Sequence, residues 1–398
     1  MREIYLVESV RTGIAKAGKS SWFTNLRADD MAALVMNELI RRAGLENKKE
    51  EIDGVILGGT ALINDMAGNI GRYATIMAGF PYSVPGCTVD RFCSSGVQTI
   101  FNAVAEINMG WGSELIIAGG VQHMTHVPMG TGSLPNPRFN EFTDKNASSM
   151  GWTAEMVARK YGISREKQDL MAYESHAKAH KATMEGLFKD EILPIEVEAP
   201  QKDGSAKKMV VDRDQGIRPE TTLESLAKLE PVFLKDELAT VTAGNSSQTN
   251  DAAAVVLVAS KEKCKELGLK PKMKLIGYKA IGVDPAYMGI GPSIAIPMAL
   301  KQAGLTLDQI DLWEINEAFA AQAVYCTEVL GIRNHQRLNP RGSGISLGHP
   351  LGCTGARIAT TIMHEMPYYG AKYAVESMCV GHGQGVAAVW EWVGDSPF

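Results

Sequence analysis

The stretch "SIAIPMALKQAGLTLDQIDLWEINEAF", residues 293–319, decides the predicted fold, because it follows the same plan as "MAALVMNELIRRAGLENKKEEIDGVILGG", residues 31–59. Each stretch has a helical pattern, then Ala-Gly-Leu, a short polar link, Ile-Asp and an apolar segment. The Gly-Leu pair is typical of a helix C-terminal cap with its hydrophobic contact, and the apolar segment is typical of a buried strand. We therefore predict that the chain contains one α/β unit twice, with Asp53 and Asp311 in matching places.

Two further pairs of segments extend the repeat. The apolar-to-helix junction "VDRFCSSGVQTIFNAV" (89–104) corresponds to "GISLGHPLGCTGARIATTIMHEM" (344–366), and each is followed by a strand, "SELIIAGG" (113–120) or "YAVESMCVGHG" (373–383). Strands that alternate with helices predict mixed, largely parallel sheets, in two halves that pack side by side.

Between the halves the pattern is irregular, apart from a helical stretch over residues 156–182, and we predict an inserted loop lobe there. The predicted boundaries place residues 1–121 and about 251–270 in the N-terminal half. The lobe then covers residues 122–250, and the C-terminal half covers residues 271–398.

Composition argues against several classes of protein. The chain has 398 residues and a formal net charge of −5, and its densest run of lysines, residues 261–274, is interleaved with glutamates and favours a solvated linker over a nucleic-acid site. The longest purely apolar run, residues 252–259, is too short to span a bilayer and fits a buried strand. The N-terminus has the pattern of a first strand and not of a signal peptide, and the six cysteines contain no Cys-x-x-Cys pair. We therefore expect free thiols in a cytoplasmic protein.

Cys93 is the first candidate for chemistry. Apolar residues recur beyond it at three- and four-residue spacing, so it lies at or just before the first turn of a helix. Unpaired amides and the positive end of the helix dipole stabilise a thiolate there and lower the pKa of the thiol. The alternative is that cysteine is simply a small residue at a crowded junction.

Three residues of the second half are further candidates. His349 precedes Pro350, which suits a first helical position, and a helix start keeps an imidazole neutral and able to accept a proton; a structural histidine is the alternative. Cys379 begins "CVGHGQG" (379–385), which fits either a glycine hairpin or a backbone with amides aimed at an oxyanion. Asn316 either ends a strand, where α/β proteins place reactive groups, or caps the next helix.

Metal and nucleotide motifs are weak. The pairs His123/His126 and His176/His180 have possible ligand spacings, but no cysteine or acidic cluster completes either set in the sequence, and the second pair fits a solvated helix face. The glycine-rich stretch before Cys353 has neither the dinucleotide pattern nor a Walker lysine. We therefore expect no metal, nucleotide cofactor or prosthetic group.

Four motifs resemble those of one family, in that family's order and spacing: "RFCSSG" (91–96), "NEAF" (316–319), "GHPLGCTGAR" (348–357) and "CVGHGQG" (379–385). "MGWTAEMVA" (150–158) and "VTAGNSSQTNDAAA" (241–254) resemble the family's loop lobe and its return to the core. The chain is similar from end to end to the thiolases, which are acetyl-CoA C-acyltransferases. The resemblance implies the α/β thiolase fold, in which two duplicated halves form αβαβα layers and an inserted loop lobe binds CoA.

The resemblance also implies a role for each matching residue. Cys93 would carry the acyl group after activation by His349, and Cys379 would move a proton on and off the α-carbon of the acetyl thioester. His349, with a water held by Asn316, would form one oxyanion hole, and the backbone N–H groups of Cys93 and Gly381 would form the other. The residues that match the family's CoA site are Met150, Arg218, Ala243, Ser247, Ala318 and Phe319.

The implied reaction is thiolytic cleavage of a 3-ketoacyl-CoA to acetyl-CoA and a shortened acyl-CoA, or the reverse Claisen condensation. CoA would be a substrate and not a cofactor, and the family implies a homodimer or homotetramer. A ketoacyl synthase-like condensing enzyme is the nearest alternative, and Cys379 argues against it. A non-catalytic acyl-CoA-binding scaffold is another, but none of the four catalytic residues is missing.

Four positions depart from the family pattern. Asp90 stands where asparagine is common, Gln122 where glutamate is common, and Ser343 and His382 where glycine is usual. His382 adds bulk and a titratable group beside Gly381. It therefore bears on substrate range and pH optimum more than on reaction class.

Overall fold

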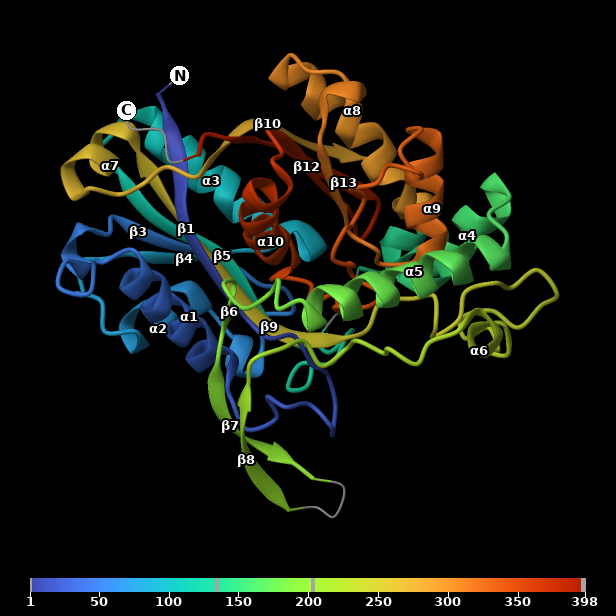
Figure 1. The fold of residues 1–398 in the computed structure, drawn as a ribbon. Coiled ribbons are helices and arrows are strands. Elements are labelled where there is room, and N and C mark those ends of the chain that lie inside the picture. Colours follow the sequence, from blue (N-terminus) through green and yellow to red (C-terminus); the bar gives the residue numbers. More distant parts are fainter. Residues whose placement is uncertain (1, 133–135, 202–204, 395–398) are drawn as a thin grey trace.

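The computed structural model describes residues 2–132, 136–201 and 205–394. Its centre is a sheet of eleven strands with the order β11-β12-β13-β10-β1-β9-β5-β3-β4, and the short strands β2 and β6 pair with β9 and β1 (Figure 1). The strands are β1 (Ile4–Thr12), β2 (Ala15–Lys16), β3 (Gly54–Gly58), β4 (Gly86–Val89), β5 (Leu115–His123), β6 (Ile192–Leu193), β9 (Asn250–Ser260), β10 (Met273–Gly282), β11 (Leu312–Ile315), β12 (Tyr373–Val380) and β13 (Gln384–Trp392). The longer helices are α1 (Ala28–Arg42), α2 (Ile70–Met77), α3 (Ser95–Met109), α4 (Met150–Tyr161), α5 (Arg165–Met184), α8 (Gly291–Ala303), α9 (Ala320–Val329) and α10 (Thr354–Tyr369).

The predicted duplication is confirmed down to single hydrogen bonds. Helices α1 and α8 end alike, because Leu45 donates to the Ile40 carbonyl at 2.9 Å and Leu305 donates to the Leu300 carbonyl at 3.0 Å. These are the bonds of the same glycine-containing helix cap.

The two aspartates of the repeat also accept equivalent backbone hydrogen bonds. Asp53 accepts the backbone N–H groups of residues 114 and 115 at the start of β5, at 2.7 and 2.9 Å. Asp311 accepts those of residues 372 and 373 at the start of β12, at 2.8 and 3.0 Å. Each aspartate thereby aligns two neighbouring parallel strands, β3 with β5 and β11 with β12.

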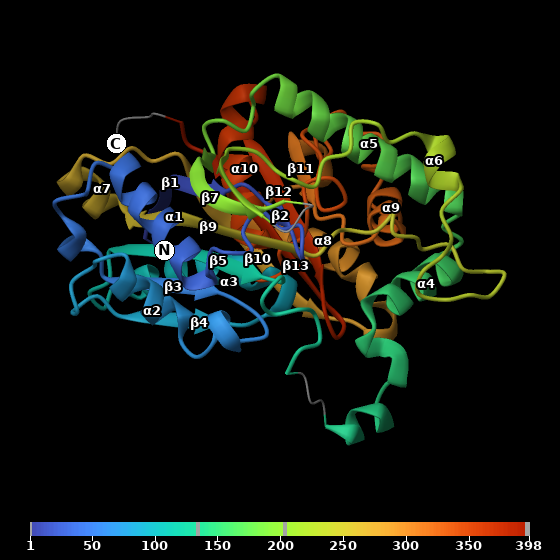
Figure 2. The ribbon, with the colours of Figure 1, turned by 90° about the horizontal axis from the view of Figure 1, so that it is seen from below.

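The helices form layers, one between the two halves and one on the outer face of each half. Helices α3 and α10 pack against each other, and their apolar residues share one core with strands of both halves. Helices α1 and α2 cover the outer face of the N-terminal strands, and α8 covers that of the C-terminal strands (Figures 1 and 2). The two half-sheets meet where β1 pairs with β10 at Leu6 and Met273.

Two details of the prediction are wrong. The sheet is mixed but not largely parallel, because β13 returns from β12 through a tight hairpin and β9 returns from the lobe, and both therefore run antiparallel to their neighbours. The lysine-rich run is also not just a linker, since it forms helix α7 (Lys261–Leu267), which the Ser260 side chain caps by accepting the N–H of Lys263.

The inserted lobe lies between β5 and β9. Helices α4 and α5 pack beside α9, next to the short helix α6 (Leu223–Ala227). The strands β7 (Ile195–Pro200) and β8 (Ala206–Val211) form a projecting hairpin (Figure 1). His176 on α5 is buried, so the expectation that the pair His176/His180 lies on a solvated face is wrong for this residue. Among the helices of the described ranges, none is long and apolar enough to cross a bilayer.

Candidate active site

Cys93 lies in a short 3₁₀ turn, Phe92–Ser94, directly before α3, as predicted. Two glycines bring this turn to the second half. A Cβ on Gly96 would lie 2.5 Å from the backbone nitrogen of Ala356, and one on Gly355 would lie 2.3 Å from that of Val97. Only residues without a side chain therefore allow α3 and α10 to approach closely at their N-terminal ends.

His349 lies in an irregular segment and not at a helix start. Helix α10 begins only at Thr354, so the prediction of Pro350 at the first helical position is wrong. The ring Nδ1 lies 2.7 Å from the Thr354 hydroxyl, which itself donates to the Pro350 carbonyl at 3.0 Å. The hydroxyl must then accept from Nδ1–H, which leaves Nε2 as the lone-pair nitrogen.

Burial decides the protonation of both junction residues. It lowers the pKa of His349 to about 3, with help from the nearby charge of Arg357. It raises the pKa of Cys93 to about 11, against the opposing effect of the backbone N–H groups of Gly381 and of Cys93 itself. The expected lowering of the Cys93 pKa by the helix start is therefore wrong, because loss of water outweighs the amides. The resting pair is a neutral thiol and a neutral imidazole.

The other predicted catalytic residues come from two segments of the second half, "NEAF" (316–319) and "CVGHGQG" (379–385). Cys379 is fully buried near the end of β12, and burial, followed by the neighbouring Cys93 thiol, raises its pKa well above the usual value. The side-chain nitrogen of Asn316 lies 3.3 Å from Nδ1 and 3.5 Å from Nε2 of His349. Asn316 does not cap α9, which begins at Ala320 with no side-chain cap. The "CVGHGQG" stretch is both a hairpin and a wall of the site, because Gly381 lines a cavity with Cys93.

Two cavities meet at Cys93. One, of about 290 Å³, is lined by Cys93, His349 and Cys379 together with four of the predicted CoA-site residues, Met150, Ser247, Ala318 and Phe319. The other, of about 400 Å³, shares Cys93 and Met150 and is walled by Gly381, His382 and apolar side chains. Ala243 and Arg218, also predicted for the CoA site, line neither cavity.

Residues 4–262 match the family model described as "Thiolase, N-terminal domain", and residues 269–392 match "Thiolase, C-terminal domain". The chain belongs to the thiolase family. It is 44% identical over 98% of its length to the whole of a 3-ketoacyl-CoA thiolase of Bacillus subtilis (strain 168), and 43% identical over 98% to the whole of one of Aliivibrio fischeri. Its fold matches the crystal structure of the Bacillus anthracis acetyl-CoA acetyltransferase with a TM-score of 0.88 and 38% identity, over 99% of each chain. As a thiolase, the chain is an acyltransferase.

The departures from the thiolase pattern have local partners. Gln122 accepts from the Gly352 N–H at 3.0 Å and donates to the Thr60 carbonyl at 3.0 Å. A carboxylate could not donate that second bond. Asp90 accepts the Phe92 N–H at 2.8 Å, which an asparagine oxygen could equally do.

A buried charged group behind His349 was missed in the sequence. Arg357, in the motif "GHPLGCTGAR", is fully buried 4.0 Å from Glu314, and Glu365 and Glu376 are also fully buried. Burial raises the pKa of Glu314 to about 8 and those of Glu365 and Glu376 well above their usual range. The sequence did indicate this, because an arginine three residues after a helix start, in a stretch of small and apolar residues, is expected to be buried.

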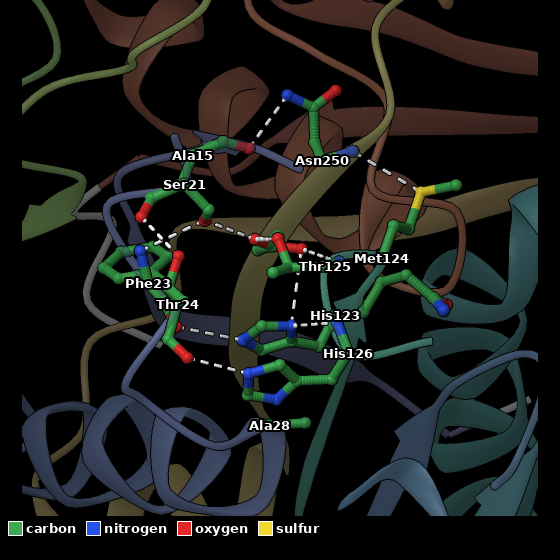
Figure 3. Close-up of polar contacts among 12 residues, drawn as sticks. Ala15, Ser21, Phe23, Thr24, Ala28, His123, Met124, Thr125, His126 and Asn250 are labelled. Carbon is green, nitrogen blue, oxygen red and sulfur yellow. Dashed lines mark hydrogen bonds and ion pairs between the residues drawn. The ribbon is translucent and has the colours of Figure 1, made fainter. Parts of the chain in front are cut away.

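The thiolase fold also brings Asp65 to His123 and His126, so the expectation that no acidic group accompanies this pair is wrong. The rings stack with centroids 3.8 Å apart (Figure 3). Nε2 of His123 bonds the Leu26 carbonyl at 2.9 Å, and Nε2 of His126 bonds the Thr24 carbonyl at 2.8 Å. Nδ1 of His126 lies 2.7 Å from Asp65, so both nitrogens of this ring face acceptors. The arrangement fits an imidazolium better than a metal ligand, because a ligand needs a free lone pair.

Proposed function

We propose that the chain cleaves 3-ketoacyl-CoA with CoA to give acetyl-CoA and a shortened acyl-CoA, or runs the reverse condensation, through an acyl group on Cys93. The observation that carries this is that one cavity is lined by Cys93, His349 and Cys379 together. Relatives named 3-ketoacyl-CoA thiolase and a structural neighbour titled acetyl-CoA acetyltransferase support it.

The first half-reaction begins from the neutral pair. The Cys93 sulfur attacks the keto carbon while its proton passes to Nε2 of His349, the nitrogen that the bond to Thr354 leaves free. Burial, which raises the pKa of the thiol to about 11 and lowers that of the imidazole to about 3, favours transfer of this proton during the attack over transfer before it. The backbone N–H groups of Cys93 and Gly381, which already act on the sulfur, stabilise the oxyanion that forms.

Cleavage then needs a second proton carrier. The bond between the α-carbon and the keto carbon breaks, its electron pair forms the acetyl-CoA enolate, and the Cys379 thiol protonates the enolate carbon. His349, with a water held by Asn316, stabilises the enolate oxygen. CoA next gives its thiol proton to the Cys379 thiolate and attacks acyl-Cys93, whose sulfur recovers its proton from His349.

The same proposal assigns the rest of the chain. Residues 122–250 form the CoA-binding lobe between halves made of residues 1–121 with about 251–270 and of residues 271–398; the last four residues, 395–398, lie outside the described structure. Ser247 supports this place for CoA, because its backbone N–H bonds the Ala318 carbonyl at 2.9 Å at the cavity wall. Arg218 would act near the nucleotide end and Ala243 along the pantetheine arm. The enzyme would be a cytoplasmic homodimer or homotetramer of fatty acid metabolism, with CoA as a substrate and no cofactor.

A thiolysis assay tests the proposal. The purified chain is incubated with free CoA and 3-ketoacyl-CoA of increasing chain length, and loss of the 3-keto thioester is followed. We expect turnover that depends on CoA and yields acetyl-CoA. Binding of acyl-CoA with no cleavage at any length would instead identify a scaffold.

A further inference from the structure

Two residues beside the reacting groups hold an unusual backbone conformation. Phe92, directly before Cys93, has φ = 46°, and His382, directly after Gly381, has φ = 60°. A left-handed conformation is unfavourable for residues with a side chain, although histidine adopts it more often than bulky residues do. Strain of this kind persists where the surroundings enforce it and gathers at functional sites.

The side chains of these two residues contact each other. The ring centroids of Phe92 and His382 are 5.1 Å apart, and Phe139 from the lobe meets His382 edge-on at 5.7 Å. A Cβ built on Gly381 would lie 3.7 Å from the Phe92 ring and 3.7 Å from Sδ of Met150. The pair of rings therefore lies against the backbone that faces the Cys93 sulfur.

The same pair lines the larger cavity. This cavity, of about 400 Å³, runs from Cys93 to apolar side chains of two loops, Leu62 and Ile63 after β3 and Val127 and Met129 after β5. A dry apolar cavity of about 150 Å³ already holds benzene, so the space accepts acyl groups well beyond acetyl. Because three of the predicted CoA-site residues, Ser247, Ala318 and Phe319, line only the other cavity, this one is left for the acyl chain.

We propose that His382, packed on Phe92, narrows the acyl cavity next to the thioester and selects unbranched acyl chains over chains branched at the carbon adjacent to the keto carbon. The inference rests on the proposed function and names its substrate class. A ring at this place restricts the first carbons of the chain, while the open apolar part of the cavity accommodates the carbons beyond them. Glycine at the same position would leave that first part wide.

Two isomeric substrates test the selection at constant carbon number: the CoA thioesters of 3-ketohexanoate and of 4-methyl-3-ketopentanoate. One methyl group in a tight apolar pocket changes kcat/KM by about 10- to 200-fold. We therefore expect the wild type to prefer the straight isomer by a factor in that range. His382→Gly should reduce the preference at least tenfold, mainly by raising kcat/KM for the branched isomer.

Three variants make the result interpretable. Glycine favours positive φ, so His382→Gly is expected to fold, and His382→Asn, which tolerates the same backbone, should give an intermediate preference. Phe142→Ala is the matched control, because Phe142 is exposed and does not line this cavity, and its preference should equal that of the wild type.

An unchanged preference in both His382 variants, or a wild type that cleaves the two isomers equally well, would overturn the assignment while leaving the thiolase proposal intact. Absence of cleavage of either isomer, and of acetoacetyl-CoA, would instead reject the proposed function itself. Each outcome is read from the same assay.

Discussion

The two junctions of the repeat, one at Cys93 and one at His349, lead into matching helices but differ in the charge of their buried side chains. Gly96 on α3 and Gly355 on α10 occupy matching positions of the repeat. Gln98 stands two residues after the first glycine and Arg357 two residues after the second, so these two side chains correspond. Gln98 accepts from the Tyr278 hydroxyl at 2.7 Å, so its partners are neutral. In the C-terminal half the same place holds a buried positive charge among buried carboxyl groups. The two halves therefore share one backbone arrangement, and they differ in the charge of the buried side chain at this position.

The comparison predicts the largest effects for the two thiols. Cys93→Ala should abolish both acylation and turnover, because no other group attacks the keto carbon. Cys379→Ala should still accept an acetyl group from acetyl-CoA, since that transfer breaks no carbon–carbon bond. Thiolysis and condensation should both fall by about 10²- to 10⁴-fold or more in this variant, because both need the α-carbon proton to move.

Intact-protein mass after incubation with acetyl-CoA, together with the rate of acetoacetyl-CoA cleavage, separates the two variants. Cys326→Ala is a matched control, since Cys326 is also a buried free thiol but lies on α9, outside both cavities. If the Cys379→Ala protein cleaves acetoacetyl-CoA at the wild-type rate, Cys379 is not the proton carrier and "CVGHGQG" is only a structural hairpin.

The next prediction compares the matched positions directly. At about pH 9, above the pKa of about 8 of Glu314, Arg357→Met should lower the free energy of unfolding by about 3 kcal/mol, because removing Arg357 leaves the ionised Glu314 buried and unpaired. Gln98→Met should cost only about 1 kcal/mol, the value of an ordinary hydrogen bond. Chemical denaturation measures both.

Arg357→Met can also be tested by the pH profile of kcat/KM, which would not change if Arg357 only stabilised the fold. Because the Arg357 charge helps to lower the pKa of His349, its removal should shift the acid limb of the kcat/KM profile to higher pH. Equal unfolding costs for the two methionine variants, with an unmoved acid limb, would contradict the contrast between the halves.

These contrasts show where sequence reasoning succeeded and where it could not. Asp53, Asp311 and the Gly-Leu caps act through neighbours a few residues away or through regular strand pairing, so their pattern predicted the duplicated fold. The pKa of Cys93 was predicted in the wrong direction, because it depends on how much water the second half excludes. Arg357 and Thr354 lay within a recognised motif, but only the folded structure shows that they lie beside Glu314 and His349.

The lobe should affect binding and not chemistry. Ser247 lines the cavity that contains Cys93, His349 and Cys379, and on the proposed function we expect Ser247→Ala to raise the apparent KM for CoA substrates more than it lowers kcat. The expected loss is about 1 kcal/mol, that of a neutral hydrogen bond. Steady-state kinetics at saturating acetoacetyl-CoA with varied CoA measures it, and a collapse of kcat at unchanged KM would move this serine into the catalytic group.

The smallest effect concerns the pair formed by His126 and Asp65. Both nitrogens of His126 face acceptors, and although burial opposes it, the bond to Asp65 raises the pKa of this histidine. A raised folded-state pKa stabilises the protein fully below the unfolded value of about 6.5, and the stabilisation is lost as pH rises through the folded pKa. The same bond lowers the pKa of Asp65 against the opposing effect of burial, so the contribution of Asp65 is lost only as pH falls below about 4.

The other groups that face this pair are His123 and Asp251, with Arg27 beside Asp65. The His126 side chain is 28% exposed, so solvent screening holds the effect below about 1 kcal/mol. The free energy of unfolding of wild type and His126→Gln should therefore differ more at about pH 5.5 than at about pH 8.5, on either side of the unfolded value. A His126→Gln cost that is the same at both pH values would show that the bond between His126 and Asp65 adds no pH-dependent stability.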